Sequence, residues 1–154
     1  MRNRGFVLHI LLAAGATWAV AGSAQAQWCW FGTVGGVAFG TYDVFSATPL
    51  DSVGSISITC LLAPSPTVAL SAGRSGSFLQ RTMASGANVL NYNLYRDAQR
   101  HTIWGDGTGG SSAYGPLNLG FYGTAKLSIY GRIPPGQDVA IGAYADTITV
   151  TVNF

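Results

Sequence analysis

Charged residues are scarce in this sequence, and glutamate is absent altogether. Charged side chains make up 9% of the 154 residues, and Lys126 is the single lysine. A chain with so little charge offers no electrostatic basis for binding nucleic acid or an anionic membrane. Strong helix formers are also missing, whereas Gly, Ser, Thr, Val, Ile and Tyr are plentiful. The composition therefore favours an all-β fold with glycine-rich turns.

The first residues have the features of a secretory signal peptide. Arg2 and Arg4 give a positively charged start, residues 6–21 form an apolar stretch, and Ala-Gln-Ala at 24–26 is a typical cleavage signal. No later segment is long and apolar enough to span a membrane. We therefore expect an exported product.

Cleavage is expected after Ala26, which divides the chain into a signal peptide, 1–26, and one domain, 27–154. A membrane anchor is the alternative, but His9 and Gly15 interrupt the apolar stretch, which is short for a span of about 20 residues. Cleavage would remove two of the eight basic residues, leaving six against six aspartates and a net charge of zero. A neutral surface favours self-association.

Cysteine is also rare, because Cys29 and Cys60 are the only two. In an exported protein, a single pair of this kind predicts a structural disulfide. A redox or metal site is the alternative, but it lacks a Cys-x-x-Cys spacing and a further cluster of His or Cys.

The residues that catalysis or metal binding would require are missing. His101 is the one histidine after position 26, and no Gly-x-Ser-x-Gly motif is present. The six aspartates fall mostly in turns, and the glycine-rich segment 105–109 lacks the acidic ligands of a calcium loop and the lysine of a phosphate loop. We therefore expect no enzyme activity, no cofactor and no metal.

Three tryptophans, Trp28, Trp30 and Trp104, have two interpretations. Aromatic rings can stack on a sugar, but in a β-sandwich a tryptophan is ordinarily a core residue. The core interpretation is favoured for all three.

The last nine residues, 146–154, show the clearest strand pattern. From Thr147 to Phe154, polar and apolar residues alternate, which predicts a strand with one apolar and one polar face. Its apolar face consists of Ile148, Val150, Val152 and Phe154. A terminal strand with this much apolar surface is expected to be held against another part of the protein or against a partner.

Other alternating stretches predict further strands. In 55–60, isoleucines alternate with Ser and Thr, so Cys60 is expected to point inward with them. Residues 90–95 form a second clear strand, and Leu127 and Ile129 mark a third. With turn signals between them, these strands predict a two-sheet sandwich.

The first strand region is expected to run from Trp28 to about Phe45. It is irregular, because four glycines between positions 32 and 40 suggest bulges or a bend.

Seven motifs in order resemble the spore coat U domain family, which includes subunits of archaic chaperone–usher pili and the spore coat protein U of myxobacteria. The resemblance as a whole covers the chain from about Cys29 to Phe154. The motifs are FGTYD (39–43), GSISITC (54–60), LSAG (70–73) with RTM (81–83), LNYNLY (90–95), WGDG (104–107), YGRIP (130–134) and GAYAD (142–146).

The resemblance implies an incomplete immunoglobulin-like β-sandwich with six strands and a seventh donated by another protein. Its partners would be a periplasmic pilus chaperone, an outer-membrane usher and a neighbouring pilin subunit that donates a strand. The product would be a fimbria on the cell surface, with a role in adhesion or biofilm formation. The expected acceptor-groove residues are Ile148, Val150, Val152 and Phe154, followed by Leu127 and Ile129. The alternative is that they are ordinary core residues of a closed sandwich.

A pilin that polymerises needs about ten alternating apolar residues before its first cysteine, as the resemblance implies. Cleavage after Ala26 leaves only Gln27 and Trp28 before Cys29. We therefore expect a tip or capping subunit that accepts a strand without donating one. The alternatives are a coat protein of spores or cysts and, less favoured, a secreted sugar-binding protein or hydrolase. For a tip subunit, Leu61, Leu62 and Ile133 are candidate surface-binding residues.

Overall fold

The chain folds into antiparallel β-sheets, as the computed structural model of residues 27–63 and 65–154 shows. The signal peptide expected at residues 1–26 lies outside the described residues. Seven strands and one short 3₁₀ helix are present in the described part. The predicted all-β class is confirmed.

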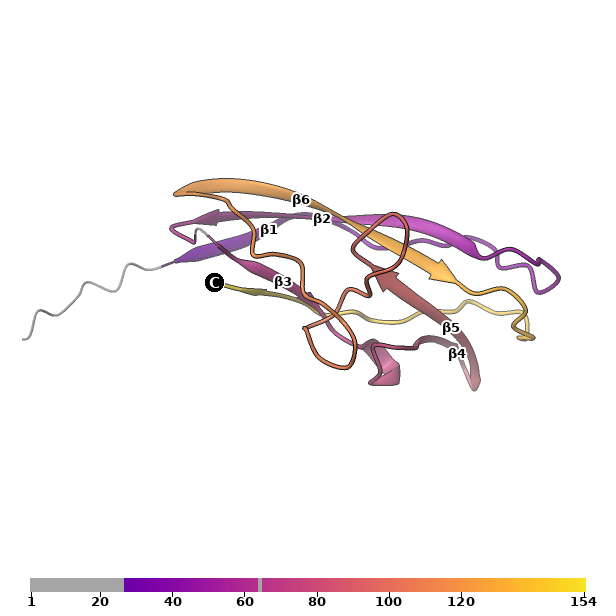
Figure 1. Cartoon of the computed structure of the whole chain (residues 1–154). Coiled ribbons are helices and arrows are strands. Elements are labelled where there is room, and N and C mark those ends of the chain that lie inside the picture. Colours follow the sequence, from indigo (N-terminus) through magenta and orange to yellow (C-terminus); the bar gives the residue numbers. More distant parts are fainter. Residues whose placement is uncertain (1–26, 64) are drawn as a thin grey trace, which may run out of the picture.

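The larger sheet has five strands in the order β1-β2-β6-β5-β4. Its two long strands, β2 and β6, pair over their whole length, from Leu50 opposite Ile133 to Leu61 opposite Tyr122. They form the upper layer in Figure 1. The strand bounds are β1 Trp28–Gly35, β2 Leu50–Leu61, β6 Tyr122–Ile133, β5 Asn88–Tyr95 and β4 Arg81–Ser85.

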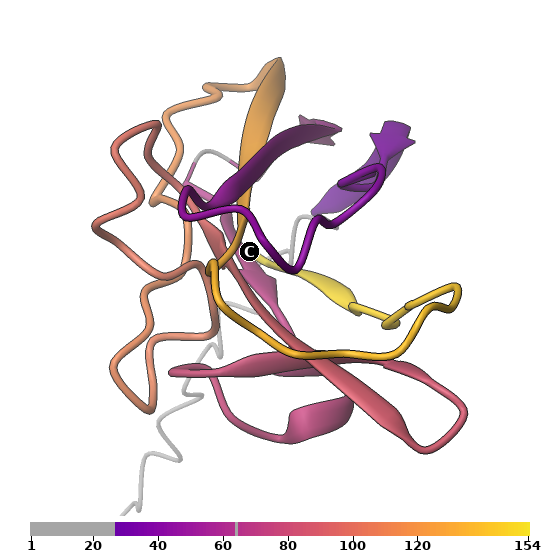
Figure 2. The same ribbon diagram turned by 90° about the vertical axis from the view of Figure 1, so that its right-hand side faces the viewer.

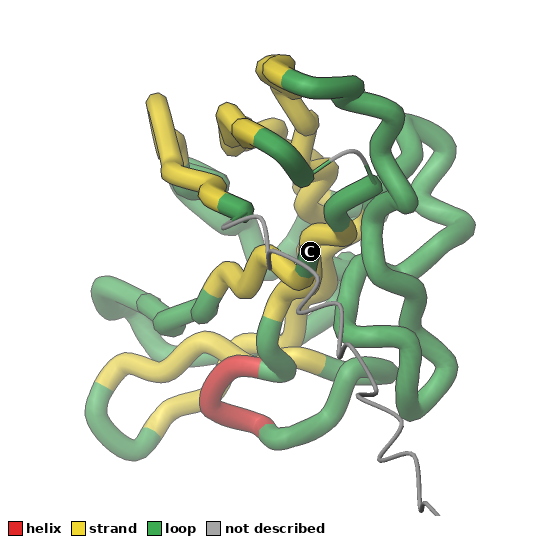
Figure 3. Tube along the Cα trace, turned by 90° about the vertical axis from the view of Figure 1, so that its left-hand side faces the viewer, coloured by secondary structure: helices red, strands yellow, loops and turns green. Residues whose placement is uncertain are grey.

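The smaller sheet consists of β3 (Thr67–Leu70) and β7 (Val150–Asn153), which lie below β2 and β6 in Figure 1. The 3₁₀ helix η1 (Gly73–Ser75) follows β3. Figure 3 looks at the end of the molecule where the C-terminus lies and shows long loops along one side of the strands. The resemblance implies six strands, whereas seven are present in the described residues, among them the hairpin of β4 with β5.

A hydrophobic core fills the space between the two sheets. The inward residues of β2 are buried as the alternation predicts, and Cys60 lies among them. Trp104 is also fully buried, and its indole N–H donates a hydrogen bond to the carbonyl of Val68, in β3. The largest fully buried core side chains include Trp104, Ile56, Ile58, Leu70, Ile133 and Val68.

The core interpretation is correct for Trp104 and wrong for Trp28 and Trp30, which are exposed. Cys29 pairs with Cys60 and therefore shares its inward face. Because successive residues of a strand point to opposite faces, the tryptophans on either side of Cys29 must point outward.

The first strand is shorter than predicted, because β1 ends at Gly35 after an irregularity between Phe31 and Val34. Phe45 lies in a turn and is 94% exposed, so it does not belong to an apolar strand face. Ile133, a candidate for surface binding, is buried at the end of β6. Its side chain follows the inward face of that strand.

Cys29 and Cys60 form a disulfide, as predicted. The bond joins opposite residues of β1 and β2 and fastens the edge strand to the large sheet. The two cysteines are 31 residues apart in the sequence, and this separation sets the length of the loop that the disulfide closes.

Replacing both cysteines with alanine is expected to lower the free energy of unfolding by about 3–4 kcal/mol, from the loop-closure entropy that the disulfide removes from the unfolded chain. Urea unfolding of the oxidised protein and the double variant, each in the assembly in which it is purified, would measure the difference. A loss below about 1 kcal/mol would contradict this entropic account.

Candidate functional site: an open groove between the first and last segments

One edge of β7 lies unpaired beside the core. Val68 exchanges both of its backbone hydrogen bonds with Tyr114, so its amide and carbonyl point away from β7. Val152, opposite Val68, is therefore in a non-hydrogen-bonded pair, and its own amide and carbonyl face the other edge. The same holds for Val150, opposite Leu70.

The two edges of the small sheet differ. The outer edge of β3 is covered by the segment 112–117, which bonds to Val68 and to the carbonyl of Pro66. In contrast, β7 has β3 as its one neighbouring strand within residues 27–63 and 65–154. The small sheet therefore has room for a further strand only beside β7.

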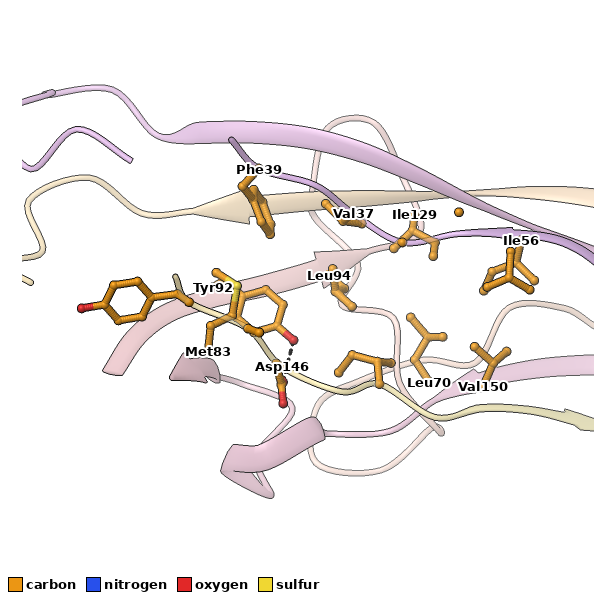
Figure 4. Close-up of a pocket in the computed structure, with 16 residues that line it drawn as sticks. Val37, Phe39, Ile56, Leu70, Met83, Tyr92, Leu94, Ile129, Asp146 and Val150 are labelled. Atoms are coloured by element: carbon orange, nitrogen blue, oxygen red, sulfur yellow. Dashed lines mark hydrogen bonds between the residues drawn. The ribbon is translucent and has the colours of Figure 1, made fainter. Parts of the chain in front are cut away.

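A cavity of about 330 Å³ lies next to this free edge. Residues 34–39 line it on one side and residues 144–150 on the other, and β2, β5 and β6 contribute its floor. In Figure 4, Val37, Ile129 and Ile56 come from the upper layer and face Leu70 and Val150 in the lower one. Apart from Asp146 and the hydroxyls of Tyr92 and Tyr144, the side chains that line it are apolar.

A second cavity, of about 980 Å³, continues the first between residues 37–45 and 139–144. The two share four lining residues: Val37, Phe39, Met83 and Tyr144. In Figure 2 the first segment, in indigo, and the last segment, in yellow, lie on the same side of the molecule. We call the two adjoining cavities the groove.

Apolar side chains beside the groove remain partly exposed. Phe31 and Val34 lie on the inward face of β1, yet they are 44% and 54% exposed. Phe154, at the end of the last segment, is 56% exposed. Inward-facing residues stay exposed in this way when a layer of the sandwich lacks a strand.

The six predicted groove residues divide into two sets. Ile148, Val150 and Ile129 line the first cavity. Leu127 is buried beneath the large sheet, whereas Val152 and Phe154 lie nearer the C-terminal end, outside the lining of either cavity. The sequence predictions name one wall of the groove and only one residue of its floor.

The opposite wall, residues 34–45, was not predicted to take part. Its glycines interrupt any regular alternation, so the pattern gave no indication of which side chains face the groove. The motif FGTYD at 39–43 marks this wall, because Phe39 lines both cavities.

Asp146 fixes the start of the last segment. Its carboxylate accepts hydrogen bonds from the Tyr92 hydroxyl at 2.7 Å and from the backbone amides of Arg74 and Thr147. Burial raises the pKa of the Tyr92 phenol, and the hydrogen bond to Asp146 raises this pKa further. Tyr92 therefore remains protonated as a hydrogen-bond donor.

The buried guanidinium of Arg81 supports the small sheet through Ser71, which follows β3. The Arg81 side chain is fully buried and donates to the carbonyls of Ser71 and Trp104 and to the Asn93 side chain. Ser71 in turn bonds to Thr149, next to β7. Burial lowers the pKa of this guanidinium. We call these hydrogen bonds of Arg81 the Arg81 clamp. Because the clamp holds Ser71, which bonds to Thr149, it positions the groove wall formed by the last segment.

Residues 27–63 and 65–154 hold no cluster of three metal-ligating side chains. His101 is exposed, and its backbone amide donates to Asp97. Within the same residues, no helix has the length and apolar character needed to cross a bilayer.

Comparison with known proteins identifies a family and a fold. Residues 14–151 match the Spore Coat Protein U domain. Protein U of Myxococcus xanthus is 34% identical over 133 residues, which cover 78% of this chain and 72% of Protein U.

A similar fold occurs in the crystal structure of the CsuC-CsuE chaperone–tip adhesion subunit pre-assembly complex from archaic chaperone-usher Csu pili of Acinetobacter baumannii. The TM-score is 0.53 at 22% identity. The match covers 84% of this chain but 40% of the chain in that complex, so the present chain spans less than half of that chain's length. The match over residues 14–151, together with the identity to Protein U, shows that the chain belongs to the Spore Coat Protein U domain family.

Proposed function

We propose that this chain is a structural subunit of a surface fibre of the chaperone–usher type, and that a strand from another protein completes its groove. The observation that carries the proposal is the free edge of β7 beside an apolar groove. A strand inserted there would pair with the backbone of Val150 and Val152 and place alternate side chains in the two cavities.

The open edge also explains why the subunit would require a chaperone. An unpaired strand edge next to exposed apolar side chains is a template for aggregation. A periplasmic chaperone that lends a strand would protect this edge until the outer-membrane usher exchanges it for a strand of the neighbouring subunit. The fold shared with a chaperone–tip adhesion subunit complex is consistent with such a partner.

The position in the fibre follows from the expected processing. Cleavage after Ala26 would leave two residues before Cys29, too few to complete a neighbour's groove. The subunit would then accept a strand without donating one, at the tip, with a role in adhesion or biofilm formation. N-terminal sequencing of the exported protein tests this position, because ten or more residues before Cys29 would exclude it.

A coat protein of spores or cysts is the second candidate, and the match to the Spore Coat Protein U domain favours it. The same groove would then be completed within a coat instead of a fibre. Expression restricted to spore or cyst formation would favour this assignment.

Periplasmic expression with and without the pilus chaperone tests the proposed function. Alone, the subunit is expected to be degraded or to aggregate, because its groove is uncovered. With the chaperone, it should be recovered as a soluble complex of one subunit and one chaperone. A soluble monomer that unfolds cooperatively in the absence of any partner would contradict the proposal.

A further inference from the structure

The outer face of the large sheet contains residues that the groove does not use. Inward residues of β2 and β6 form the core, so the alternate residues face outward. In Figure 1 this outer face lies at the top, away from β3 and β7. On β6 it consists of Tyr122, Thr124, Lys126, Ser128, Tyr130 and Arg132.

Aromatic side chains gather at one end of this face. Trp28 and Tyr122 both stand opposite Leu61 in the pairing of β1, β2 and β6, and the Trp30 ring centroid lies 6.3 Å from that of Tyr122. Trp28, Trp30 and Tyr122 are 62%, 48% and 63% exposed. Neighbouring aromatic rings exposed to this extent indicate a binding surface.

Hydroxyl groups continue the face along the sheet. The exposed Thr124 stands opposite Thr59, whose side chain is buried and whose hydroxyl lies 2.8 Å from that of Thr124. Ser55 stands opposite Ser128, two cross-strand pairs further along on the same face. From Tyr122 to Tyr130 the face extends about 26 Å along β6, at about 3.3 Å per residue. This length accommodates several sugar rings of a chain that lies along the strand.

The charge of the face is positive. Lys126, the single lysine of the sequence, is exposed in the middle of the hydroxyl rows. At the far end, Arg132 and Arg100 both contact Asp51, at 2.7 and 3.2 Å, so two cations surround one carboxylate. The hydrogen bond from Arg132 holds the pKa of the Asp51 carboxyl below its usual value. The surplus of cations favours an anionic ligand.

We propose that an acidic polysaccharide binds along the outer face of β2 and β6, with its sugar rings on Trp28, Trp30 and Tyr122 and its carboxylates near Lys126. Sugar rings are apolar on one face and hydroxylated at their edges, which matches aromatic rings beside hydroxyl side chains. Nucleic acid fits this face poorly, because its affinity depends on many cations along the phosphate backbone.

Binding of the exported protein to polygalacturonate, in the assembly in which it is purified, tests this site. Dextran serves as the neutral polysaccharide and phosphatidylglycerol vesicles as a different anionic surface. Binding to polygalacturonate is expected to weaken about fivefold for Lys126→Gln and about tenfold for Trp30→Ala, as losses of about 1 and 1.4 kcal/mol would produce. Dextran should bind at least about tenfold more weakly than polygalacturonate.

Arg74→Gln is the matched control, because it removes the same charge from η1, on the opposite side of the molecule in Figure 1. It should leave polygalacturonate binding unchanged. An equal loss in Arg74→Gln and Lys126→Gln would overturn the site, as would equal affinity for dextran or for the vesicles. Absence of binding to polygalacturonate would also overturn it. Chaperone capture is measured separately, so either proposal can fail without the other.

Discussion

Val150→Asp abolishes capture of the subunit by its chaperone if a donated strand fills the groove. The Val150 side chain lines the first cavity, and its backbone groups face the free edge of β7. In the open subunit an aspartate at this position can reach water, but a strand laid over it would bury the carboxylate without a partner. Burial of an unpaired charge costs several kcal/mol. Since each 1.4 kcal/mol is a tenfold change, the loss of affinity should exceed about a hundredfold.

Two variants of the same segment separate this effect from a general loss of folding. Thr151→Asp places the same charge one residue further, on the exposed face of β7, and should be captured normally. Val150→Thr keeps the shape of the side chain and should be captured with a loss of about 1–2 kcal/mol. Co-purification with the chaperone, measured for all three variants and for Val152→Asp, gives the comparison. Equal capture of Val150→Asp and Thr151→Asp would show that β7 is not the docking edge.

The wall formed by the last segment could be predicted from the sequence because its alternation is local. Each of Ile148, Val150 and Val152 follows a threonine, so one face of the strand is apolar whatever lies beyond it. The inward direction of Cys60 follows from the same rule. In contrast, the groove exists because residues 34–39 lie across from residues 144–150, and no local pattern specifies that two segments so far apart in the sequence face each other.

The exposure of Trp28 and Trp30 followed from information already in the sequence. An inward Cys60 bonded to Cys29 fixes Cys29 inward as well, and its two neighbours must then face outward. The general preference of tryptophan for sandwich cores obscured this conclusion. For these two residues, the strand geometry and the disulfide place the side chains outside, although tryptophan generally prefers the core of a sandwich.

The burial of Arg81 could not be predicted, since arginine is seldom buried unless it is paired. Its partners are the carbonyls of Ser71 and Trp104 and the amide oxygen of Asn93, which the sequence separates and the fold brings together. A basic residue between two polar ones has no distinguishing pattern. Only the tertiary structure shows that this cation lies inside the sandwich.

Arg81→Met is expected to lower the free energy of unfolding by about 3 kcal/mol, because the methionine fills the space but leaves three buried acceptors without their donor, at about 1–3 kcal/mol for each orphaned group. Removing the desolvated guanidinium offsets part of this loss. Arg81→Lys should lose nearly as much, since one ammonium cannot reproduce the planar fork that spans Ser71, Asn93 and Trp104. Thermal and urea unfolding of the subunit in its chaperone complex would measure both changes.

Arg74→Met provides the comparison for Arg81→Met, because Arg74 is an exposed arginine in the neighbouring 3₁₀ helix and its replacement should change stability by no more than about 0.5 kcal/mol. The Arg81 clamp also holds Ser71 against Thr149, beside β7. Arg81→Met should therefore reduce chaperone capture together with stability, whereas Val150→Asp should reduce capture through the groove alone. An Arg81→Met variant as stable as the unaltered subunit would show that these hydrogen bonds do not support the groove.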